Sequence, residues 1–232
     1  MDIKSWEKYC AANVTGGYKP GGKARNLPSS GLAVVEFLQA YGILRNDIDI
    51  LDVGCGNGRL AIGLDLSTLT GFSYHGLEIV MPAVEFCQQA FQSKPHVHFT
   101  HLDVFNQRYW HAGRQKAENV AFPVETMSKD VVVAFSLFTH MANTAQATNY
   151  LAEMLRVLRE GGTLFSTWSF TTLRDNVAIN EKHTIWHVNH VLDLMPPGAD
   201  FHFLPLYNDR FKNWYKFTGA PNQVGIIITK GD

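Results

Sequence analysis

Short apolar stretches recur along the chain and alternate with segments of helical periodicity. Apolar or β-branched runs predict strands at 48–53, 73–78, 97–102, 130–135 and 163–168. Apolar side chains at helical spacing lie between them, at 59–66, 84–92 and 143–158. The valine-rich run 130–135 suits a strand buried on both faces. Strands that alternate with helices predict a doubly wound α/β fold with a mostly parallel sheet and helices on both faces.

The two ends of the chain extend this pattern. Before the first strand, it predicts a short helix at 3–12, a glycine-rich loop at 13–28 and a second helix that ends near Gly42. After residue 170, it predicts a helix near 178–194 and strands near 201–206 and 223–229, which bring the sheet to seven strands. We expect a single domain over 1–232, in which a core (48–170) follows an N-terminal segment (1–42), a candidate lid, and precedes a C-terminal segment (171–232).

Composition narrows the classes of function. The 232 residues suffice for one large α/β domain, and 46% of them are hydrophobic. With 20 Lys and Arg against 21 Asp and Glu, the formal net charge is −1, so no charge bias favours nucleic acid or an anionic membrane. The three cysteines show no disulfide or metal spacing, and no apolar run approaches the roughly 20 residues of a membrane helix. We therefore expect a cytoplasmic monomer or homodimer.

A glycine-rich loop follows the first predicted core strand. Asp52-Val53-Gly54-Cys55-Gly56-Asn57-Gly58 joins this strand to a helix and carries three alternating glycines. Glycines let a ligand approach the backbone, and the helix start offers N–H groups and a positive dipole end. The plain alternative is a strand-to-helix turn whose glycines serve packing. A loop of this kind after a strand indicates a Rossmann-like nucleotide site.

The loop fits more than one nucleotide. Read from Gly56, the dinucleotide pattern gives Gly56, Gly58 and Ala61, so a nicotinamide-dependent oxidoreductase is one alternative. Read from Gly54, the pattern places Arg59 where the third glycine belongs. Asp52, just before the first glycine, would repel a pyrophosphate and would suit a cationic ligand without phosphate.

From Asp52 onward the sequence resembles the class I S-adenosylmethionine-dependent methyltransferases, in order across about 48–170. Their first motif is a strand, an acid and G-x-G-x-G, and segments 122–132 and 156–164 follow the family pattern around its fourth and fifth strands. The resemblance implies S-adenosylmethionine as cofactor, Glu78 on the ribose hydroxyls and Asp103 on the adenine amino group. The chain departs from the pattern at Lys129 and in a long 104–121 connection, which we expect to contribute to substrate choice.

The implied cofactor site comprises Asp52, Gly54, Cys55, Gly56, Asn57, Gly58, Glu78, Ile79, Asp103, Val104 and Ser136. Arg25, on the N-terminal glycine-rich loop with Tyr18, is a candidate ligand for the amino-acid carboxylate of the cofactor. A solvated arginine is the alternative for Arg25. A non-catalytic S-adenosylmethionine-binding protein would carry the same cofactor residues, and only turnover separates it from an enzyme.

Methyl transfer is an in-line displacement, in which positioning dominates and a general base assists some acceptors. His140, in Ser136-Leu137-Phe138-Thr139-His140-Met141 after the fourth strand, is the candidate base; its alternative is a histidine that caps or packs a helix start. This loop lacks the Pro-Pro-aromatic pattern of many nucleic-acid base methyltransferases, so we expect a small-molecule acceptor.

The last third of the chain holds the remaining candidates. Eight aromatic residues between 186 and 217 suit a pocket for an organic ligand. His183, His187 and His190 would form one stripe on a helix, but this spacing alone is a weak metal signal, and we expect no metal site.

Overall fold

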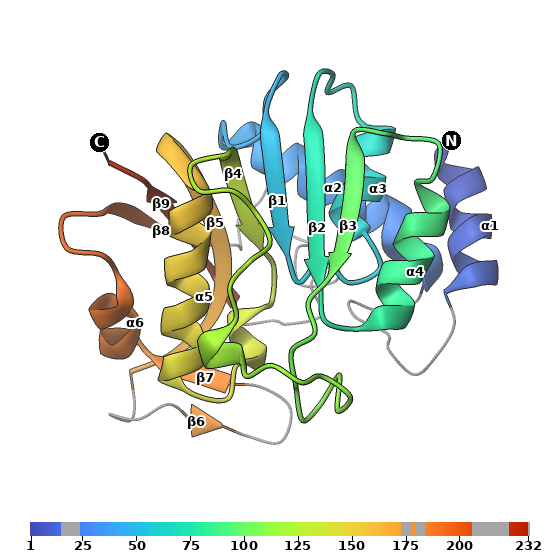
Figure 1. Cartoon of the computed structure of the whole chain (residues 1–232). Helices are drawn as coiled ribbons and strands as arrows, with labels where there is room; N and C mark the ends of the chain where they lie inside the picture. Colours follow the sequence, from blue (N-terminus) through green and yellow to red (C-terminus); the bar gives the residue numbers. More distant parts are fainter. Residues whose placement is uncertain (15–23, 173–177, 180–183, 206–222, 232) are drawn as a thin grey trace.

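The computed structural model describes residues 1–14, 24–172, 178–179, 184–205 and 223–231 (Figure 1). Five parallel strands form its centre: β1 (Asp49–Val53), β2 (Ser73–Glu78), β3 (Val97–His101), β4 (Lys129–Ala134) and β5 (Leu158–Thr171). Antiparallel β9 (Gln223–Thr229) pairs with β5, and β8 (Asp200–Pro205) pairs with β9. The main body of the sheet therefore has the order β3-β2-β1-β4-β5-β9-β8. The expected α/β, Rossmann-like fold with a mostly parallel sheet is confirmed.

Two short strands bring the described sheet to nine. β7 (Thr184–His187) pairs in parallel with the last residues of β5, and β6 (Ala178–Ile179) pairs with β7. Figure 1 places both at the end of the molecule where the arrows of β1, β2 and β3 point. They therefore extend the sheet at its carboxyl edge, where ligands of open α/β sheets bind.

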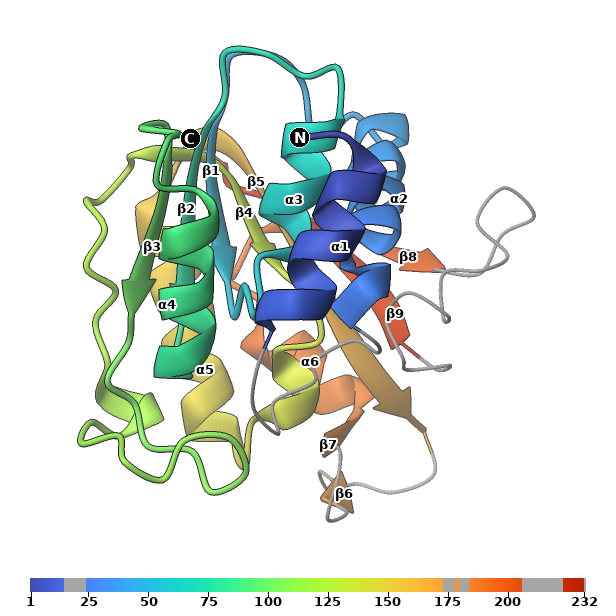
Figure 2. The same ribbon diagram turned by 90° about the vertical axis from the view of Figure 1, so that its right-hand side faces the viewer.

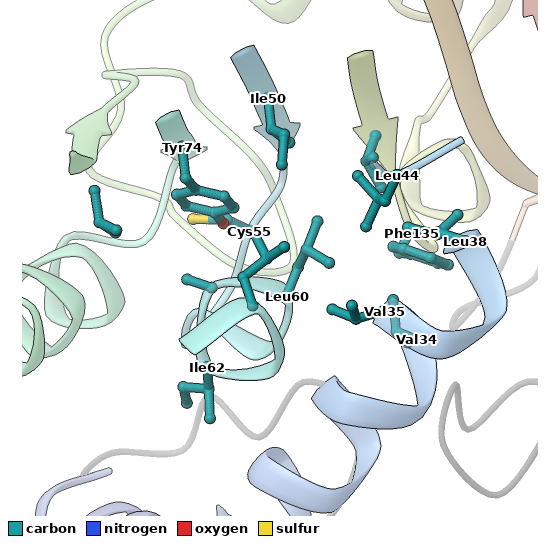
Figure 3. Close-up of a cluster of buried hydrophobic side chains, with 14 of the residues drawn as sticks. Val34, Val35, Leu38, Leu44, Ile50, Cys55, Leu60, Ile62, Tyr74 and Phe135 are labelled. Atoms are coloured by element: carbon teal, nitrogen blue, oxygen red, sulfur yellow. The ribbon is translucent and has the colours of Figure 1, made fainter. Parts of the chain in front are cut away.

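Helices cover both faces of the sheet. One core cluster packs α1 (Ile3–Asn13), α2 (Leu27–Ala40), α3 (Arg59–Leu66) and α4 (Met81–Ala90) on one face. The other cluster contains α5 (Thr144–Val157), α6 (Val188–Leu194) and apolar residues of the β3–β4 connection. Figure 2 shows α1, α2 and α3 on one side of the sheet and α5 on the other. The first cluster contains side chains of α2 and α3 together with Cys55 of the glycine loop and Tyr74 of β2 (Figure 3).

The β3–β4 connection is irregular over nearly all of its length. Residues 102–128 hold the single 3₁₀ turn η2 (Ala117–Asn119) and no α-helix, and this stretch is described throughout. Arg156 and Glu153 of α5 fix the connection by hydrogen bonds to the backbone of Phe122 and Val124. Polar bonds to α5 thus fix the connection, while its apolar side chains join the core cluster on that face.

The region 178–194 differs from the expected helix. It holds β6, β7 and only then α6, so His187 and His190 do not share one helical stripe, and His183 lies outside the described residues. Tertiary contacts explain the difference, because Trp186 Nε1 donates to Phe138 O at 2.9 Å and Thr184 Oγ1 donates to Met141 O at 2.5 Å. These bonds hold 184–187 in extended form beside the turn η3 (Phe138–His140).

No helix in the described ranges combines the length and apolar character needed to span a membrane.

Candidate active site

The glycine loop between β1 and α3 turns through left-handed backbone. Gly54, Gly56 and Gly58 have φ of 78°, 56° and 72°, a region that glycine enters without steric cost. Gly54 N and Cys55 N donate to Leu77 O at 2.8 and 3.1 Å, which ties the loop to β2. A Cβ on Gly54 would lie 3.1 Å from Leu137 Cδ1, so the loop also packs against the segment after β4. The loop therefore lies at the switch point where the strand order reverses.

Glu78 joins the end of β2 to this loop. Its side chain is only 3% exposed, and Oε2 accepts a hydrogen bond from Gly56 N at 2.8 Å. Oε1 accepts from Ile79 N at 2.7 Å and from Val80 N at 2.9 Å. An ionised carboxylate offers about four acceptor positions, and these bonds to backbone N–H groups stabilise its charged form. Glu78 therefore shapes the loop in addition to any contact with a ligand.

Asp52 lies beneath the loop, on the face covered by α1 to α4. It is 4% exposed, and Tyr74 Oη donates to its Oδ2 at 2.7 Å. Burial raises the pKa of Asp52 to about 7, while the Tyr74 hydrogen bond and the nearby Arg59 guanidinium oppose this rise. The carboxylate thus belongs to a buried polar group, and its charge changes near neutral pH.

Arg59, the first residue of α3, is a charged group of the site that the sequence did not single out. Its guanidinium lies 5.4 Å from the ring centroid of Phe135, the residue that follows β4. Burial lowers the pKa of Arg59, and attraction to Asp52 counters this. The available sequence signal for Arg59 was its position, because dinucleotide-binding loops need a glycine there.

Asp103 is paired with another residue of its own loop. Arg114 Nε lies 2.5 Å from Asp103 Oδ2, and Arg114 N donates to Asp103 Oδ1 at 3.2 Å. The Arg114 hydrogen bonds lower the pKa of Asp103. The pair closes the start of the long connection into a loop, in which buried Val104 forms a bridge with Gln115. Arg114 was not expected, because no periodicity relates these positions in an irregular segment.

His140 ends η3, beyond the carboxyl end of β4. Tyr109 Oη lies 3.3 Å from its Nδ1 and 3.2 Å from its Nε2, and the two rings are nearly perpendicular, at 82°. An oxygen equally distant from both ring nitrogens lies over the imidazole face rather than in its plane. Tyr109 comes from the long 104–121 connection, so that connection does reach the candidate base. Burial raises the pKa of the Tyr109 phenol.

The remaining predicted site residues lie at different depths. Cys55 and Asn57 are buried at the loop, and Cys87 Sγ of α4 lies 3.6 Å from Gly56 O. Arg25 is exposed in η1 (Ala24–Asn26), just before α2. Tyr18 and the aromatic residues at 207–217 lie outside the described residues. The described residues contain no group of three or more His, Cys, Asp or Glu that could hold a metal ion.

Ser136 connects β4 to η3 in a left-handed conformation, with φ of 56°. Its backbone N donates to Thr167 Oγ1 at 2.7 Å, and its hydroxyl meets the Gln223 side-chain amide. Gln223 is another polar residue here that the sequence did not single out. Its position at the start of an expected strand gave no signal of a polar contact.

Comparison with known proteins identifies related sequences and folds. A family model described as a methyltransferase domain matches residues 51–166, which is half of the chain. A SAM-dependent methyltransferase from Methanosarcina mazei superposes with a TM-score of 0.54 at 16% identity, covering 83% of this chain and 97% of that one. A TehB-like SAM-dependent methyltransferase from Corynebacterium glutamicum gives 0.55 at 16% identity, with 98% and 95% covered.

A third structure matches over part of a longer chain. Phosphoethanolamine N-methyltransferase 1 of Haemonchus contortus, in complex with phosphoethanolamine and S-adenosylhomocysteine, gives a TM-score of 0.61 at 16% identity. The match covers 99% of this chain and 48% of that one, so this chain spans about half of that protein. At these identities the three structures show a shared fold, while the family model places the conserved domain over the glycine loop, Glu78 and Asp103.

Proposed function

The chain belongs to the class I S-adenosylmethionine-dependent methyltransferase family, and on that premise we propose that it methylates a small-molecule acceptor held beside His140 and Tyr109. The observation that carries this proposal is the contact of these two side chains at the carboxyl edge of the sheet. The family match disfavours the alternative of a nicotinamide-dependent oxidoreductase.

The residues at the glycine loop fit the cofactor chemically. The loop backbone takes left-handed φ values at its three glycines, which carry no side chain between the backbone and a ligand. Asn57 lies at the loop with only 6% of its surface exposed, and its side-chain amide offers both donors and an acceptor. Such an amide suits a polar ligand that approaches the loop. When bound, S-adenosylmethionine supplies an electrophilic methyl group on a sulfonium.

Within this proposal, five of the predicted residues have the following tasks. Glu78 holds the ribose hydroxyls while its other contacts fix Gly56, and Ile79 provides an apolar wall for the adenine. Asp103 and Val104 line the adenine edge beside Arg114. Arg25 would bind the amino-acid carboxylate from η1.

His140 is the proposed general base. It would accept the proton that an acceptor hydroxyl or ammonium loses, because histidine is the side chain that most often carries out general acid–base catalysis. Tyr109 lies over the imidazole face of this residue. The pair would then select acceptors small enough to enter between η3 and the long connection.

Two observations support a small molecule as the acceptor. The loop after β4 lacks the proline pair common in enzymes that methylate nucleic-acid bases, and the formal net charge is −1. The β3–β4 connection and β6–β7 both lie at the carboxyl edge in Figure 1, where they would border a compact site.

Radiolabel transfer tests this proposal. The protein is incubated with S-adenosylmethionine carrying a tritiated methyl group and, separately, with pools of polar metabolites, total RNA, DNA and protein. We expect label in the metabolite pool. Label confined to a macromolecular pool would contradict the small-molecule acceptor, and binding without any transfer would favour a non-catalytic binding protein.

His140→Ala tests the base. Loss of a general base should lower kcat by roughly 10²–10⁴-fold. Affinity for S-adenosylhomocysteine, measured by calorimetry, should change little, because His140 lies beyond the expected cofactor residues. Equal turnover in both proteins would assign His140 to packing.

A further inference from the structure

The turn between β4 and the candidate base depends on one serine in a conformation that suits glycine. Ser136 has φ of 56°, a left-handed region that most L-residues avoid for steric reasons. Strained residues of this kind persist only where their surroundings fix them, and they concentrate at functional sites. The contacts of Ser136 therefore carry information about the site.

Every polar group of Ser136 is bonded to a different part of the fold. Its N–H donates to Thr167 Oγ1 of β5 at 2.7 Å, and its carbonyl accepts from Thr139 Oγ1 of η3 at 2.8 Å. Its hydroxyl lies 3.2 Å from Oε1 and 3.1 Å from Nε2 of Gln223 in β9. Thr167 and Thr139 are almost fully buried, and Gln223 is 7% exposed.

Together these bonds determine the direction in which η3 leaves β4. His140 N donates to Leu137 O at 2.9 Å, so the base lies one short turn after Ser136. A change of backbone conformation at Ser136 would move that turn as a unit. The three residues that hold Ser136, namely Thr139, Thr167 and Gln223, have no ionisable side chain.

We propose that Gln223 and Thr167 are positioning residues, which hold Ser136 in its left-handed conformation and thereby direct His140 toward the acceptor. This inference rests on the proposed role of His140. It assigns the Ser136 hydroxyl to the protein scaffold rather than to the cofactor. It also makes the last strand of the sheet part of the acceptor site, through a side chain 83 positions from the base.

Two substitutions of Ser136 separate positioning from stability. Ser136→Gly and Ser136→Ala both remove the hydroxyl, but glycine also relieves the left-handed strain. We expect Ser136→Gly to keep or raise the melting temperature and Ser136→Ala to lower it. In both, the His140 amide should exchange with solvent about tenfold faster by NMR, the equivalent of one lost hydrogen bond.

Unchanged exchange at His140 in both variants would overturn the proposal. So would reduced S-adenosylhomocysteine affinity with unchanged exchange, because the hydroxyl would then bind the cofactor directly. These readouts need no acceptor, and a failure of the acceptor chemistry is therefore distinguishable from a failure of the positioning.

Gln223 variants test the other side of the contact. Gln223→Met should shift the His140 ring signals in histidine-labelled NMR spectra and accelerate exchange of its amide. Gln223→Glu keeps an oxygen that accepts from the Ser136 hydroxyl, and it should retain the wild-type ring signals. As a matched control, Gln88→Met removes a glutamine bond to Phe99 O on the opposite face and should leave His140 unchanged. Equal effects of Gln223→Met and Gln88→Met would show a general structural role and overturn the assignment.

Discussion

Asp52 combines deep burial with an ionisable group. Its desolvation outweighs the hydrogen bond from Tyr74 and the attraction of Arg59, which leaves the pKa of the carboxyl near 7. The glycine loop thus lies next to a buried carboxyl group whose charge depends on pH. The sequence indicated an acid at this position but not its burial, because burial follows from the packing of α3 and Tyr74 around it.

Replacement of Asp52 should remove a pH dependence of stability. The folded-state pKa is raised from 3.8 to about 7, so between these values the folded protein binds more protons than the unfolded chain. The contribution of Asp52 to the free energy of unfolding is present below about pH 4 and is lost as pH rises toward 7. Asp52→Asn still offers Tyr74 an oxygen acceptor. In urea titrations, the variant should gain stability relative to the wild type between about pH 5 and 7; a constant difference would contradict the burial argument.

His75 should change the pH dependence of stability in the direction opposite to that of Asp52. Burial lowers its pKa to about 4, with Lys129 and His98 adding to the effect, and its Nε2 lies 2.8 Å from Thr100 Oγ1. The unfolded chain therefore binds more protons between about pH 4 and 6.5, and this contribution to stability is lost as pH falls through that window. His75→Gln should flatten the acid limb of the stability curve, measured by urea midpoints at several pH values. An unchanged acid limb would show that His75 is protonated in the folded protein.

Glu78 should prove more than a ligand of the cofactor. Glu78→Ala should cost roughly 1.5–3 kcal/mol of S-adenosylhomocysteine affinity, the range for hydrogen bonds that involve a charge. It should also lower stability, since Gly56 N loses its acceptor. Calorimetry and thermal unfolding measure the two effects. Glu78→Gln keeps an oxygen acceptor and should recover more of the stability than of the affinity; full affinity in Glu78→Ala would exclude a ribose contact.

At the scale of elements, α2 and α3 cross at a pair of glycines. A Cβ on Gly63 would lie 2.2 Å from Gly31 O, and a Cβ on Gly31 would lie 2.2 Å from Arg59 O. No side chain fits between these backbones. The close crossing fixes α2, and the η1 turn that precedes it, against the helix that starts at the glycine loop.

Gly63→Ala tests this crossing. Alanine favours an isolated helix by about 1 kcal/mol over glycine, but overpacking against backbone should cost about 1–3 kcal/mol and should dominate. We expect a lower urea midpoint together with weaker S-adenosylhomocysteine binding, because α3 carries Arg59 and follows the loop. A stabilised variant would show that the helices separate without cost.

The sequence predicted those elements whose identity depends on local pattern. Periodicity identified the five parallel strands, and the acid with alternating glycines located the loop at the start of α3. Periodicity could not identify β7, because its extended form depends on hydrogen bonds from Thr184 and Trp186 to the segment around η3. Tyr109 was missed for a similar reason, since an irregular connection gives no periodicity that would place a side chain over His140.

At the scale of the whole molecule, the carboxyl ends and the amino ends of the parallel strands have different roles. The candidate site lies at the carboxyl edge. At the opposite edge, Arg159 Nη1 bonds Asp130 Oδ1 at 2.8 Å and Nη2 bonds Asp49 Oδ2 at 2.7 Å. These ion pairs join β1, β4 and β5 far along the strands from the glycine loop.

Arg159→Met should therefore separate stability from binding. The partly exposed ion pairs should contribute about 1 kcal/mol to the free energy of unfolding, less at high salt. Affinity for S-adenosylhomocysteine should remain unchanged. Thermal unfolding at low and high salt, with calorimetry, checks both expectations, and a parallel loss of affinity would show that the two edges are coupled.

The position of β9 has a consequence for synthesis on the ribosome. The strand is last in the sequence but lies between β5 and β8, and among the described strands β8 pairs with β9 alone. Until residues 223–229 leave the exit tunnel, β5 exposes an unpaired edge over 163–169, and β8 has no partner. Exposed strand edges invite pairing with other chains. A nascent chain stalled before residue 223 would thus expose the unpaired edge of β5 to chaperones and to other nascent chains on the same polysome.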